Sequence, residues 1–359
     1  MSIQEQTWLD KSFKDSVRLL SELIEIPSYS RQENDLVDFF QEKMVRDKIT
    51  FKRIGNNLLA YNNQFKESKK TILLNSHVDT VLPNESYTLD PFTSIINEGK
   101  LFGLGSNDAG ASLVCLYEVF KQFNASTNEK YNVIFAATAE EEISGQNGIV
   151  KLLEYLPPIE LAIVGEPTAL KIAIAEKGLL VLDCKCVGAG GHAAHGGENA
   201  IYKALSDIDW FRHYQFEKQS EMLGPIKMQV TMLSAGTQHN ALPAECRFTV
   251  DVRTTDAYSH EELLEIIKQH VSCKVKARSM RLRSSGLIQN HFITDVAAKL
   301  SIPTYGSPTL SDQALMPFPS IKIGPGISER SHAADEFIYL EEIKSGLQTY
   351  SQLIKKIIQ

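Results

Sequence analysis

Histidines and carboxylates occur in this chain in a combination that could bind metal ions. All of them follow short apolar segments or lie in polar loops. They are His77, Asp79, Asp108, Glu140 to Glu142, Glu166 and His332. Imidazole nitrogens and carboxylate oxygens both bind zinc, and a catalytic zinc keeps one position open for water. The residue types therefore predict a site for a borderline-hard divalent metal.

The number of candidate ligands favours two metal ions over one. Two histidines and three carboxylates are more than a single zinc needs if water is also to bind. Two ions about 3.5–4 Å apart share one carboxylate and one water. We expect Asp108 to be the shared ligand, because it ends the glycine-containing loop 103–108, where the chain can approach closely.

Hydrolysis at such a site also needs a base. A metal-bound water has a pKa of about 7, and a neighbouring group must take its second proton and deliver it to a leaving group. Glu141 and Glu142 are adjacent, so one can bind metal while the other stays free, and the residue types leave open which. Asp79 is expected to accept the other N–H of His77 and to fix its tautomer.

Each segment also has an ordinary structural explanation. A His-x-Asp pair occurs often by chance, the three glutamates could begin a solvated helix, and residues 165–167 could form a plain turn. His332 could be a surface residue. The metal hypothesis depends on the joint occurrence of these segments behind predicted strands.

Four short apolar segments precede the polar ones and predict buried parallel strands. They cover residues 70–76, 131–137, 159–164 and 320–323. In open α/β sheets, ligands bind outside the carboxyl ends of such strands. The polar residues that follow these strands are therefore expected to meet at one edge of a sheet.

The remaining periodicity predicts two domains. Helices are expected at 10–25, 33–45, 111–123, 148–155 and 292–300, between the strands. Antiparallel strands at 172–175, 179–187, 226–233 and 246–253, with helices at 199–214 and 260–271, form a different pattern. We expect an α/β metal-binding catalytic domain with a mainly parallel central sheet at 1–172 and 284–359, and an inserted α+β domain at 173–283.

Composition limits the possible partners and compartment. The 359 residues carry a net charge of −7 without a dense Lys/Arg stripe, so no nucleic acid is expected to bind. No apolar run approaches the length of a membrane span, and the first residues do not read as a signal peptide. The five cysteines lack CxxC spacing, and buried reduced thiols are their simplest explanation. A cytoplasmic protein is expected.

The order of these segments resembles the M20 metallopeptidase family. The matching stretches are 77–79, 105–108, 138–142, 164–167 and 331–336. The resemblance implies that His77, Asp108, Glu142, Glu166 and His332 hold two zinc ions, for which cobalt or manganese could substitute. It also implies Glu141 as general base and Asp79 as partner of His77. Glu140 falls where the family usually has Asp.

The resemblance further implies a ferredoxin-like lid that forms a homodimer. Gly190-Gly191-His192-Ala193 is similar to the family's lid motif, whose histidine reaches the partner subunit's active site and stabilises the developing oxyanion. Spacing alone does not choose between His192 and His195. Substrate contacts are implied for Asn240, Arg253 and Lys177, and for Gly324 and Gly326 in the segment 324–332.

That last segment is most similar to the acetylornithine deacetylase branch of the family. The expected activity is removal of an N-acyl group from a small amino acid, as in arginine biosynthesis, with N-acetylornithine first and related ornithine, citrulline or lysine derivatives next. Succinyl-diaminopimelate desuccinylase is less favoured, since Leu310 stands where those members carry Thr. A dipeptidase or aminopeptidase with the same metals, and a non-catalytic binding protein, are the alternatives from other classes.

Overall fold

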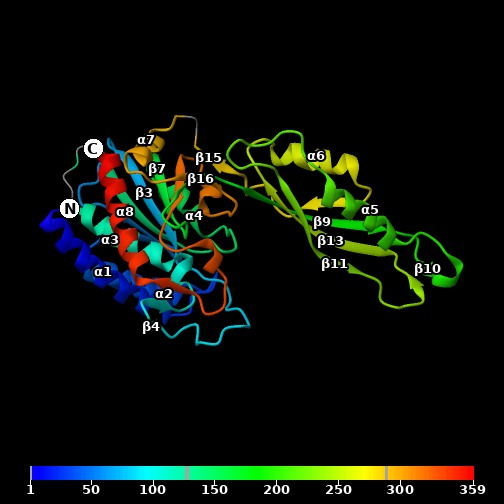
Figure 1. The fold of residues 1–359 in the computed structure, drawn as a ribbon, viewed down its shortest axis with the longest axis horizontal. Coiled ribbons are helices and arrows are strands. Elements are labelled where there is room, and N and C mark those ends of the chain that lie inside the picture. The colour runs from blue at the N-terminus through cyan, green and yellow to red at the C-terminus, as the bar shows by residue number, and fades with distance from the viewer. Residues whose placement is uncertain (1, 126–127, 129, 288–289) are drawn as a thin grey trace. The chain divides into compact units, whose positions relative to one another are not determined.

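The structure is a computed structural model that describes residues 2–125, 128, 130–287 and 290–359. Its chain divides into two compact units (Figure 1). Unit 1 comprises Met1–Ile174, Leu287–Tyr305 and Ser311–Gln359, and unit 2 comprises Ala175–Gly286 and Gly306–Leu310. Residues 306–310 differ from the sequence-based division, because Ser307 accepts a backbone hydrogen bond of 3.0 Å from Lys177.

Unit 1 is built on a central sheet whose middle strands are parallel. The strand order is β1 (Thr50–Ile54), β2 (Asn57–Tyr61), β6 (Tyr131–Thr138), β3 (Lys70–His77), β7 (Ile159–Gly165), β17 (Ser320–Ile323) and β8 (Ile172–Glu176). The pairings β6–β3, β3–β7 and β7–β17 are parallel, and the outer pairings are antiparallel. The expected mixed α/β fold with a largely parallel sheet is confirmed.

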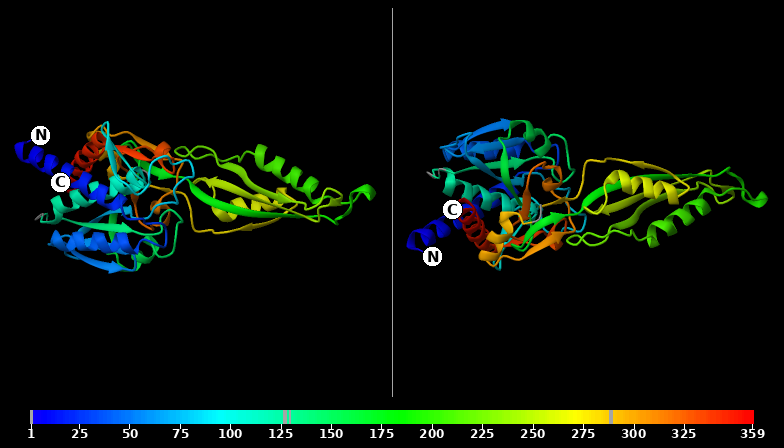
Figure 2. Two further views of the ribbon diagram at one scale, coloured as in Figure 1. Left: turned by 90° about the horizontal axis from the view of Figure 1, so that it is seen from below. Right: turned by 90° about the horizontal axis from the view of Figure 1, so that it is seen from above.

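Helices cover both faces of this sheet. They are α1 (Ile3–Ile24), α2 (Asn34–Arg46), α3 (Ala111–Asn124), α4 (Ile149–Leu152), α7 (Phe292–Lys299) and α8 (Leu340–Ile358). Helices α1, α3 and α8 lie side by side on one face (Figures 1 and 2). Strand side chains alternate between the faces, so Ile72 and Leu74 of β3 join the core under these helices while Leu73 joins the core under α4.

The predicted elements of unit 1 agree with the structure except at the first helix. The apolar spacing predicts a start at residue 10, but α1 begins at Ile3. Ser2 caps the helix: its hydroxyl accepts from the Glu5 N–H at 3.2 Å, and the Glu5 carboxylate accepts from the Ser2 N–H at 2.8 Å. Such a capping box starts a helix without an apolar residue. The small antiparallel sheet of β4 (Ile95–Asn97), β5 (Lys100–Phe102) and β18 (Phe337–Tyr339) is not predicted.

Unit 2 has the order of elements of a ferredoxin-like fold. Its elements are β9 (Gly178–Val187), α5 (Ala200–His213), β11 (Lys227–Ala235), β13 (Glu245–Thr254), α6 (His260–His270) and β14 (Lys274–Ala277). The antiparallel sheet has the order β11-β13-β9-β14, which is the βαββαβ arrangement. Both helices share one core with one face of the sheet (Figure 2).

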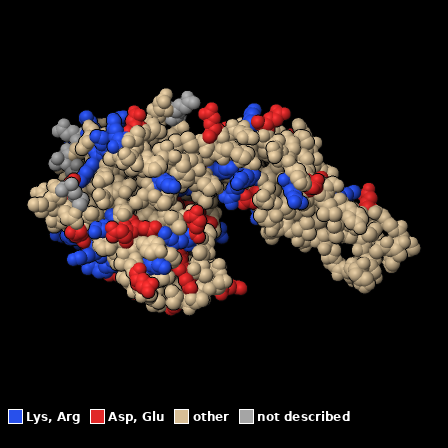
Figure 3. Space-filling model, in the orientation of Figure 1, with Lys and Arg blue, Asp and Glu red and all other residues tan. Residues whose placement is uncertain are grey.

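Two further features bear on membranes and nucleic acids as partners. Within the described residues, no helix is both long and apolar enough to cross a bilayer. Figure 3 shows Lys and Arg side chains interspersed with Asp and Glu over the face that it draws, without a single-sign stripe there.

Candidate metal centre

Parallel strands of unit 1 end next to one another and carry the candidate residues at their ends. His77 is the last residue of β3 and pairs with Thr138, the last residue of β6. Gly165 ends β7 opposite Ile323 of β17, and Glu166 follows directly. Because parallel strands place their carboxyl ends at one edge, the residues at 77, 141–142 and 166 meet there.

Asp108 lies between the two histidines. Its Oδ1 is 3.4 Å from His77 Nε2, and its Oδ2 is 3.7 Å from His332 Nε2. Glu166 Oε1 lies 3.9 Å from His77 Nε2, and Glu142 Oε2 lies 3.0 Å from His332 Nε2. Two ligands on one tetrahedral zinc, each bonded at about 2.0–2.1 Å, lie about 3.4 Å apart. The side chains are therefore spaced as two ligand groups that share Asp108.

Both adjacent glutamates point into this site. One possible ligand atom each from His77, Asp108 and Glu142 lie within 4.8 Å of one another, and the same holds for His77, Glu141 and Glu166. Glu140 does not join them, because its carboxylate accepts from the backbone N–H and side-chain amide of Asn147 at 3.1 and 2.8 Å. Glu140 thus lies outside the centre, while Glu141 and Glu142 face it.

Two buried polar atoms in the centre have no hydrogen-bond partner within the described part of the chain. They are His77 Nε2 and Glu166 Oε1. Burying a polar atom without a partner costs about 1–3 kcal/mol, so such atoms are rare in folded proteins. A cation between them would satisfy both, and the donor set of imidazole nitrogen and carboxylate oxygen fits a divalent metal.

The electrostatics of the centre also favour a cation. Burial, together with the charge of Asp108, raises the pKa of Glu166 to about 8. Burial and the charge of Glu166 raise the pKa of Glu141 well above its ordinary value. The hydrogen bond to Glu142 raises the pKa of His332 to about 9. Repulsion between neighbouring carboxylates adds to burial at both glutamates, and a dication would offset that repulsion.

Main-chain and side-chain hydrogen bonds orient the ligands. His77 Nδ1 lies 2.8 Å from the backbone oxygen of Asp79 and 3.7 Å from its carboxylate, which leaves Nε2 to face the centre. The expectation that the Asp79 carboxylate fixes the His77 tautomer is therefore corrected, because the main-chain oxygen takes that place. The carboxylate accepts instead from the N–H groups of Glu141 and Glu142, at 3.0 and 3.2 Å, and from Ser30 Oγ at 2.7 Å.

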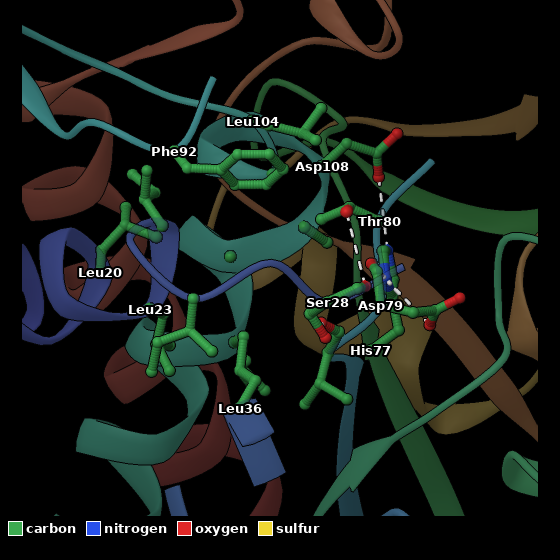
Figure 4. A pocket seen from close by; sticks show the side chains of 17 residues that line it. Leu20, Leu23, Ser28, Leu36, His77, Asp79, Thr80, Phe92, Leu104 and Asp108 are labelled. Carbon is green, nitrogen blue, oxygen red and sulfur yellow. Dashed lines mark hydrogen bonds and ion pairs between the residues drawn. The ribbon is translucent and has the colours of Figure 1, made fainter. Parts of the chain in front are cut away.

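An apolar wall supports the centre from behind. Figure 4 shows Leu20, Leu23, Leu36, Phe92 and Leu104 around a small cavity that also borders the metal-centre residues at 77, 79 and 108. The cavity encloses about 30 Å³, room for a water molecule but not for a substrate. His332 is half-exposed, whereas His77 is buried, so access to the centre is on the His332 side.

Residues 73–356 match the model of "Peptidase family M20/M25/M40". The chain belongs to this family. Membership makes the protein a hydrolase of amide bonds, and it agrees with the resemblance found in the sequence.

Curated relatives of this M20 hydrolase carry two different names. A succinyl-diaminopimelate desuccinylase from Dinoroseobacter shibae is 25% identical over 273 residues, which cover 71% of this chain and 72% of that protein. An acetylornithine deacetylase from Buchnera aphidicola is 25% identical over 380 residues, which cover 94% and 97%. Among solved structures, a Bacillus subtilis protein described as "a Dinuclear Metal Binding Peptidase from M20 Family" superposes with a TM-score of 0.74, at 17% identity over 97% of this chain and 99% of that chain.

The two glycines expected to contact substrate are packing positions in the M20 hydrolase. A Cβ on Gly324 would lie 2.2 Å from Ser112 Oγ and 2.5 Å from the backbone oxygen of Glu166. A Cβ on Gly326, whose φ is +83°, would lie 2.3 Å from Asn107 Oδ1. Both glycines therefore let buried backbone approach the loops that carry Glu166 and Asp108, and their contact with substrate stays a prediction.

Four other candidates lie in unit 2. His192 pairs with Ala241 across the short strands β10 (Gly191–His192) and β12 (Ala241–Leu242), which places it near Asn240, and both side chains are exposed. The Lys177 ammonium is buried and donates to the backbone oxygen of Pro225 at 2.5 Å. The Arg253 guanidinium forms two hydrogen bonds, of 2.8 and 3.0 Å, with the carboxylate of Asp251. The fold thus brings His192 and Asn240 together, while protein groups engage Lys177 and Arg253.

Sequence reasoning missed two buried carboxylates of the M20 hydrolase. Asp312 accepts from Asn75 Nδ2 at 3.0 Å and Thr138 Oγ1 at 2.8 Å, and burial raises its pKa to about 6. Glu336 accepts from the backbone N–H groups of Gly105, Asn107 and Asp108 at 3.0, 2.8 and 2.9 Å. Glu336 lies inside the stretch 331–336 that resembles the family, but that resemblance assigned it no role.

Glu336 thus holds the Asp108 loop, and we expect Glu336→Gln to loosen it. The new amide N–H₂ must face a backbone N–H donor, which costs about 1–3 kcal/mol of unfolding free energy. Changes in groups that orient metal ligands typically lower metal affinity 10–100-fold. Denaturant unfolding and competition with a chelator would measure both effects.

Glu329→Gln is the matched control, because Glu329 is exposed in the same segment. It should change the unfolding free energy by less than about 0.5 kcal/mol. Wild-type metal affinity in the Glu336→Gln protein would contradict the positioning role.

Proposed function

We propose that this M20 hydrolase is a two-zinc deacylase that removes an acyl group from the α-amine of a small amino acid, with N-acetylornithine as the first candidate. The single observation that carries the proposal is the position of Asp108, with one carboxylate oxygen toward each histidine. His77 and Glu166 would hold one ion with Asp108, and His332 and Glu142 would hold the other. Cobalt and manganese suit the same ligands, so metal availability decides between them.

The residues of the centre divide the work of hydrolysis. When bound, the metal pair supplies an activated water and polarises the amide carbonyl. Glu141 takes a proton from the attacking water and returns it to the leaving amine. Burial and the charge of Glu166 raise the pKa of the Glu141 carboxyl well above the ordinary value, which favours its holding the proton that it takes from water. Asp79 keeps Glu141 in place through its backbone N–H.

The oxyanion of the tetrahedral intermediate needs donors aimed at it. We assign this role to the partner subunit's His192, within a homodimer formed through unit 2. The edge strand β11 supports the assignment, since Met232 is 62% and Leu233 57% exposed on it. Long exposed edges with apolar side chains favour pairing with another chain. In Figure 3 the end of unit 2 that carries β10 shows few charged side chains.

The substrate assignment rests on the activity for which one curated relative is named and on one segment of this chain, residues 324–332. The acetylornithine deacetylase relative aligns over nearly the whole chain, and residues 324–332 are most similar to that branch. Leu310 argues against the desuccinylase, although four similar curated proteins bear that name and two of them align over 95% of this chain. The alternative is a peptidase, as the Bacillus subtilis structure is described. The five unpaired cysteines support a reducing compartment such as the cytoplasm.

Replacing the base should separate metal binding from turnover. In Glu141→Gln the amide cannot carry the proton, so kcat should fall about 10²–10⁴-fold. Metal analysis should still find about two ions per chain, because Glu141 is not an assigned ligand. Glu154→Gln, an exposed glutamate beyond the site, is the control and should keep wild-type turnover. Near-normal kcat in Glu141→Gln would remove Glu141 from the mechanism.

A substrate screen before and after chelation tests the proposed activity. N-acetyl and N-succinyl derivatives of ornithine, citrulline, lysine and diaminopimelate would be offered together with two dipeptides. We expect chelator-sensitive release of ornithine or a close analogue, restored by added zinc. Cleavage of dipeptides alone would replace the proposal with the peptidase alternative, and turnover that survives complete metal removal would contradict the mechanism.

Mixed dimers test the assignment of His192. His192→Ala and Glu141→Gln homodimers should both be nearly inactive. If His192 acts across the dimer, each mixed dimer contains one site with both groups intact, and equal mixing should restore about a quarter of wild-type activity. Two affinity tags would isolate the mixed dimer. An isolated mixed dimer without recovered activity would show that His192 does not act on the partner's site.

A further inference from the structure

Unit 2 holds four of the five cysteines of the chain, which are Cys184, Cys186, Cys246 and Cys273. Cys184 and Cys186 are two residues apart on β9, so their side chains share one face of the sheet. Cys246 on β13 pairs directly with Cys186. All three belong to the core that α5 and α6 cover. The cysteines are therefore gathered beneath the helices.

Cys273 lies just before β14, the strand that pairs with the edge of β9 opposite β13. The pairing of β14 with β9 places Lys274 opposite Lys185 and Val275 opposite Cys184, and Cys273 immediately precedes this pairing. The neighbouring Cys184 thiol, burial and the Asp207 carboxylate raise the pKa of the Cys273 thiol. Possible ligand atoms of Cys273, Cys186 and Asp207 lie within 4.8 Å of one another, so sulfur atoms from two separate segments lie close to each other and to a carboxylate.

The carboxylate belongs to Asp207, which lies on α5. It is 5% exposed, and Cys186 Sγ lies 3.5 Å from its Oδ2. The backbone N–H groups of Ser272 and Cys273 donate to its two oxygens, both at 2.9 Å, and Ser272 Oγ donates at 3.2 Å. These bonds fix the carboxylate in an orientation that faces the thiols. Groups that hold a ligand in this way are typical of metal sites.

The ligand atoms have the spacing of a coordination site. One ligand atom each from Cys186, Asp207 and Cys273 lie within 4.8 Å of one another. Thiolate sulfur selects soft or borderline ions such as Zn²⁺, Cd²⁺ and Cu⁺, whereas carboxylates with imidazoles also accept harder ions. The donor set in unit 2 therefore differs in chemistry from the sulfur-free set around Asp108.

We propose that Cys186, Cys273 and Asp207 form a second metal site, in unit 2, which binds a soft d¹⁰ cation such as Zn²⁺ or Cd²⁺, with Cys184 as an additional sulfur. Burial raises the pKa of the Cys186 thiol to about 12, so the thiols are protonated until a metal arrives. Binding replaces each S–H bond with a sulfur–metal bond and releases the proton to solvent. No oxidant or reductant takes part.

Cys273 is the least buried of the four cysteines of unit 2, and the adjacent Ser272 is exposed, whereas Cys184 and Cys186 are buried. The start of β14 is therefore the part of the cluster nearest to solvent. Cys115 offers the contrast within the same chain, because it is the one cysteine of unit 1 and its thiol donates to the backbone oxygen of Ile343 at 3.4 Å.

Cobalt and cadmium are suitable probes, since sulfur ligands give charge-transfer absorption that oxygen and nitrogen ligands do not. The full chain, kept reduced with a phosphine, would be titrated with Co²⁺ alone and with Cd²⁺ alone. We expect a thiolate-to-metal band whose intensity corresponds to one sulfur-bound ion per chain, in addition to the ions that the Asp108 centre binds. The band should be lost in Cys273→Ser and Cys186→Ser, weakened in Asp207→Asn, and kept in Cys115→Ser.

A second measurement keeps the test independent of folding in the variants. In the wild-type chain, bound Cd²⁺ should protect Cys186 and Cys273 from a thiol reagent under mild denaturation, while Cys115 reacts as before. Absence of a sulfur band at saturating Cd²⁺, or its persistence in both Cys→Ser variants, would overturn the proposal. Loss of two thiols as a disulfide in metal-free, air-exposed protein, with no band in the reduced protein, would also overturn it.

Discussion

The concentration of carboxylates around Asp108 is the constraint on which the rest of unit 1 depends. Asp108, Glu141, Glu142 and Glu166 gather in a largely dry space with two histidines, and their charges repel one another. Such a group persists only where other bonds outweigh the repulsion. The surrounding structure supplies bonds that hold the loops carrying these carboxylates: backbone N–H groups of residues 105–108 donate to Glu336, those of residues 141 and 142 donate to Asp79, and Asn147 donates to Glu140.

The central sheet gives the metal centre rigid support. The strands β3, β6, β7 and β17 are held by neighbours on both sides, so the loops at their ends start from fixed points. Two of these end positions adopt left-handed backbone conformations without being glycine: Glu140 at φ 55° and His332 at φ 59°. Conformations of this kind cost about 1–3 kcal/mol and concentrate at functional sites. Here the strained residues bound the centre, and the hydrogen bonds of its neighbours hold them in place.

The sequence predicted the parts of this arrangement that depend on local pattern. Apolar runs that end in His77, Glu140–Glu142 and Glu166 identified the strands and the edge at which they meet. This was possible because the burial and the end of a strand depend on neighbouring residues in the sequence. Interactions between segments far apart in the sequence cannot be predicted from such local patterns. Nothing in the sequence says that the Glu336 carboxylate closes on the N–H groups of residues 105–108, or that Gly324 is glycine because Ser112 and Glu166 occupy the space of a side chain.

Asp79 illustrates the limit most clearly. A carboxylate two residues from a histidine is the expected partner of its imidazole, yet in a strand-end turn the main-chain oxygen is nearer, at 2.8 Å against 3.7 Å. The side chain is then free to bind the glutamate loop instead. Residue type predicted that Asp79 belongs to the site, and only the backbone geometry decided which of its oxygens faces His77.

The two donor sets of the chain imply a division of metals between its units. Carboxylates and imidazoles accept zinc, cobalt and manganese with modest preference, so the ion at Asp108 follows availability. Thiolates bind soft ions far better than manganese, so on the proposed second site an exchange of metal in unit 1 leaves the occupant of unit 2 unchanged. Cys184 and Cys186 lie in β9, one of the two inner strands of the unit-2 sheet. A cation that joins β9 to α5 and the start of β14 would therefore stabilise that unit whatever metal serves catalysis.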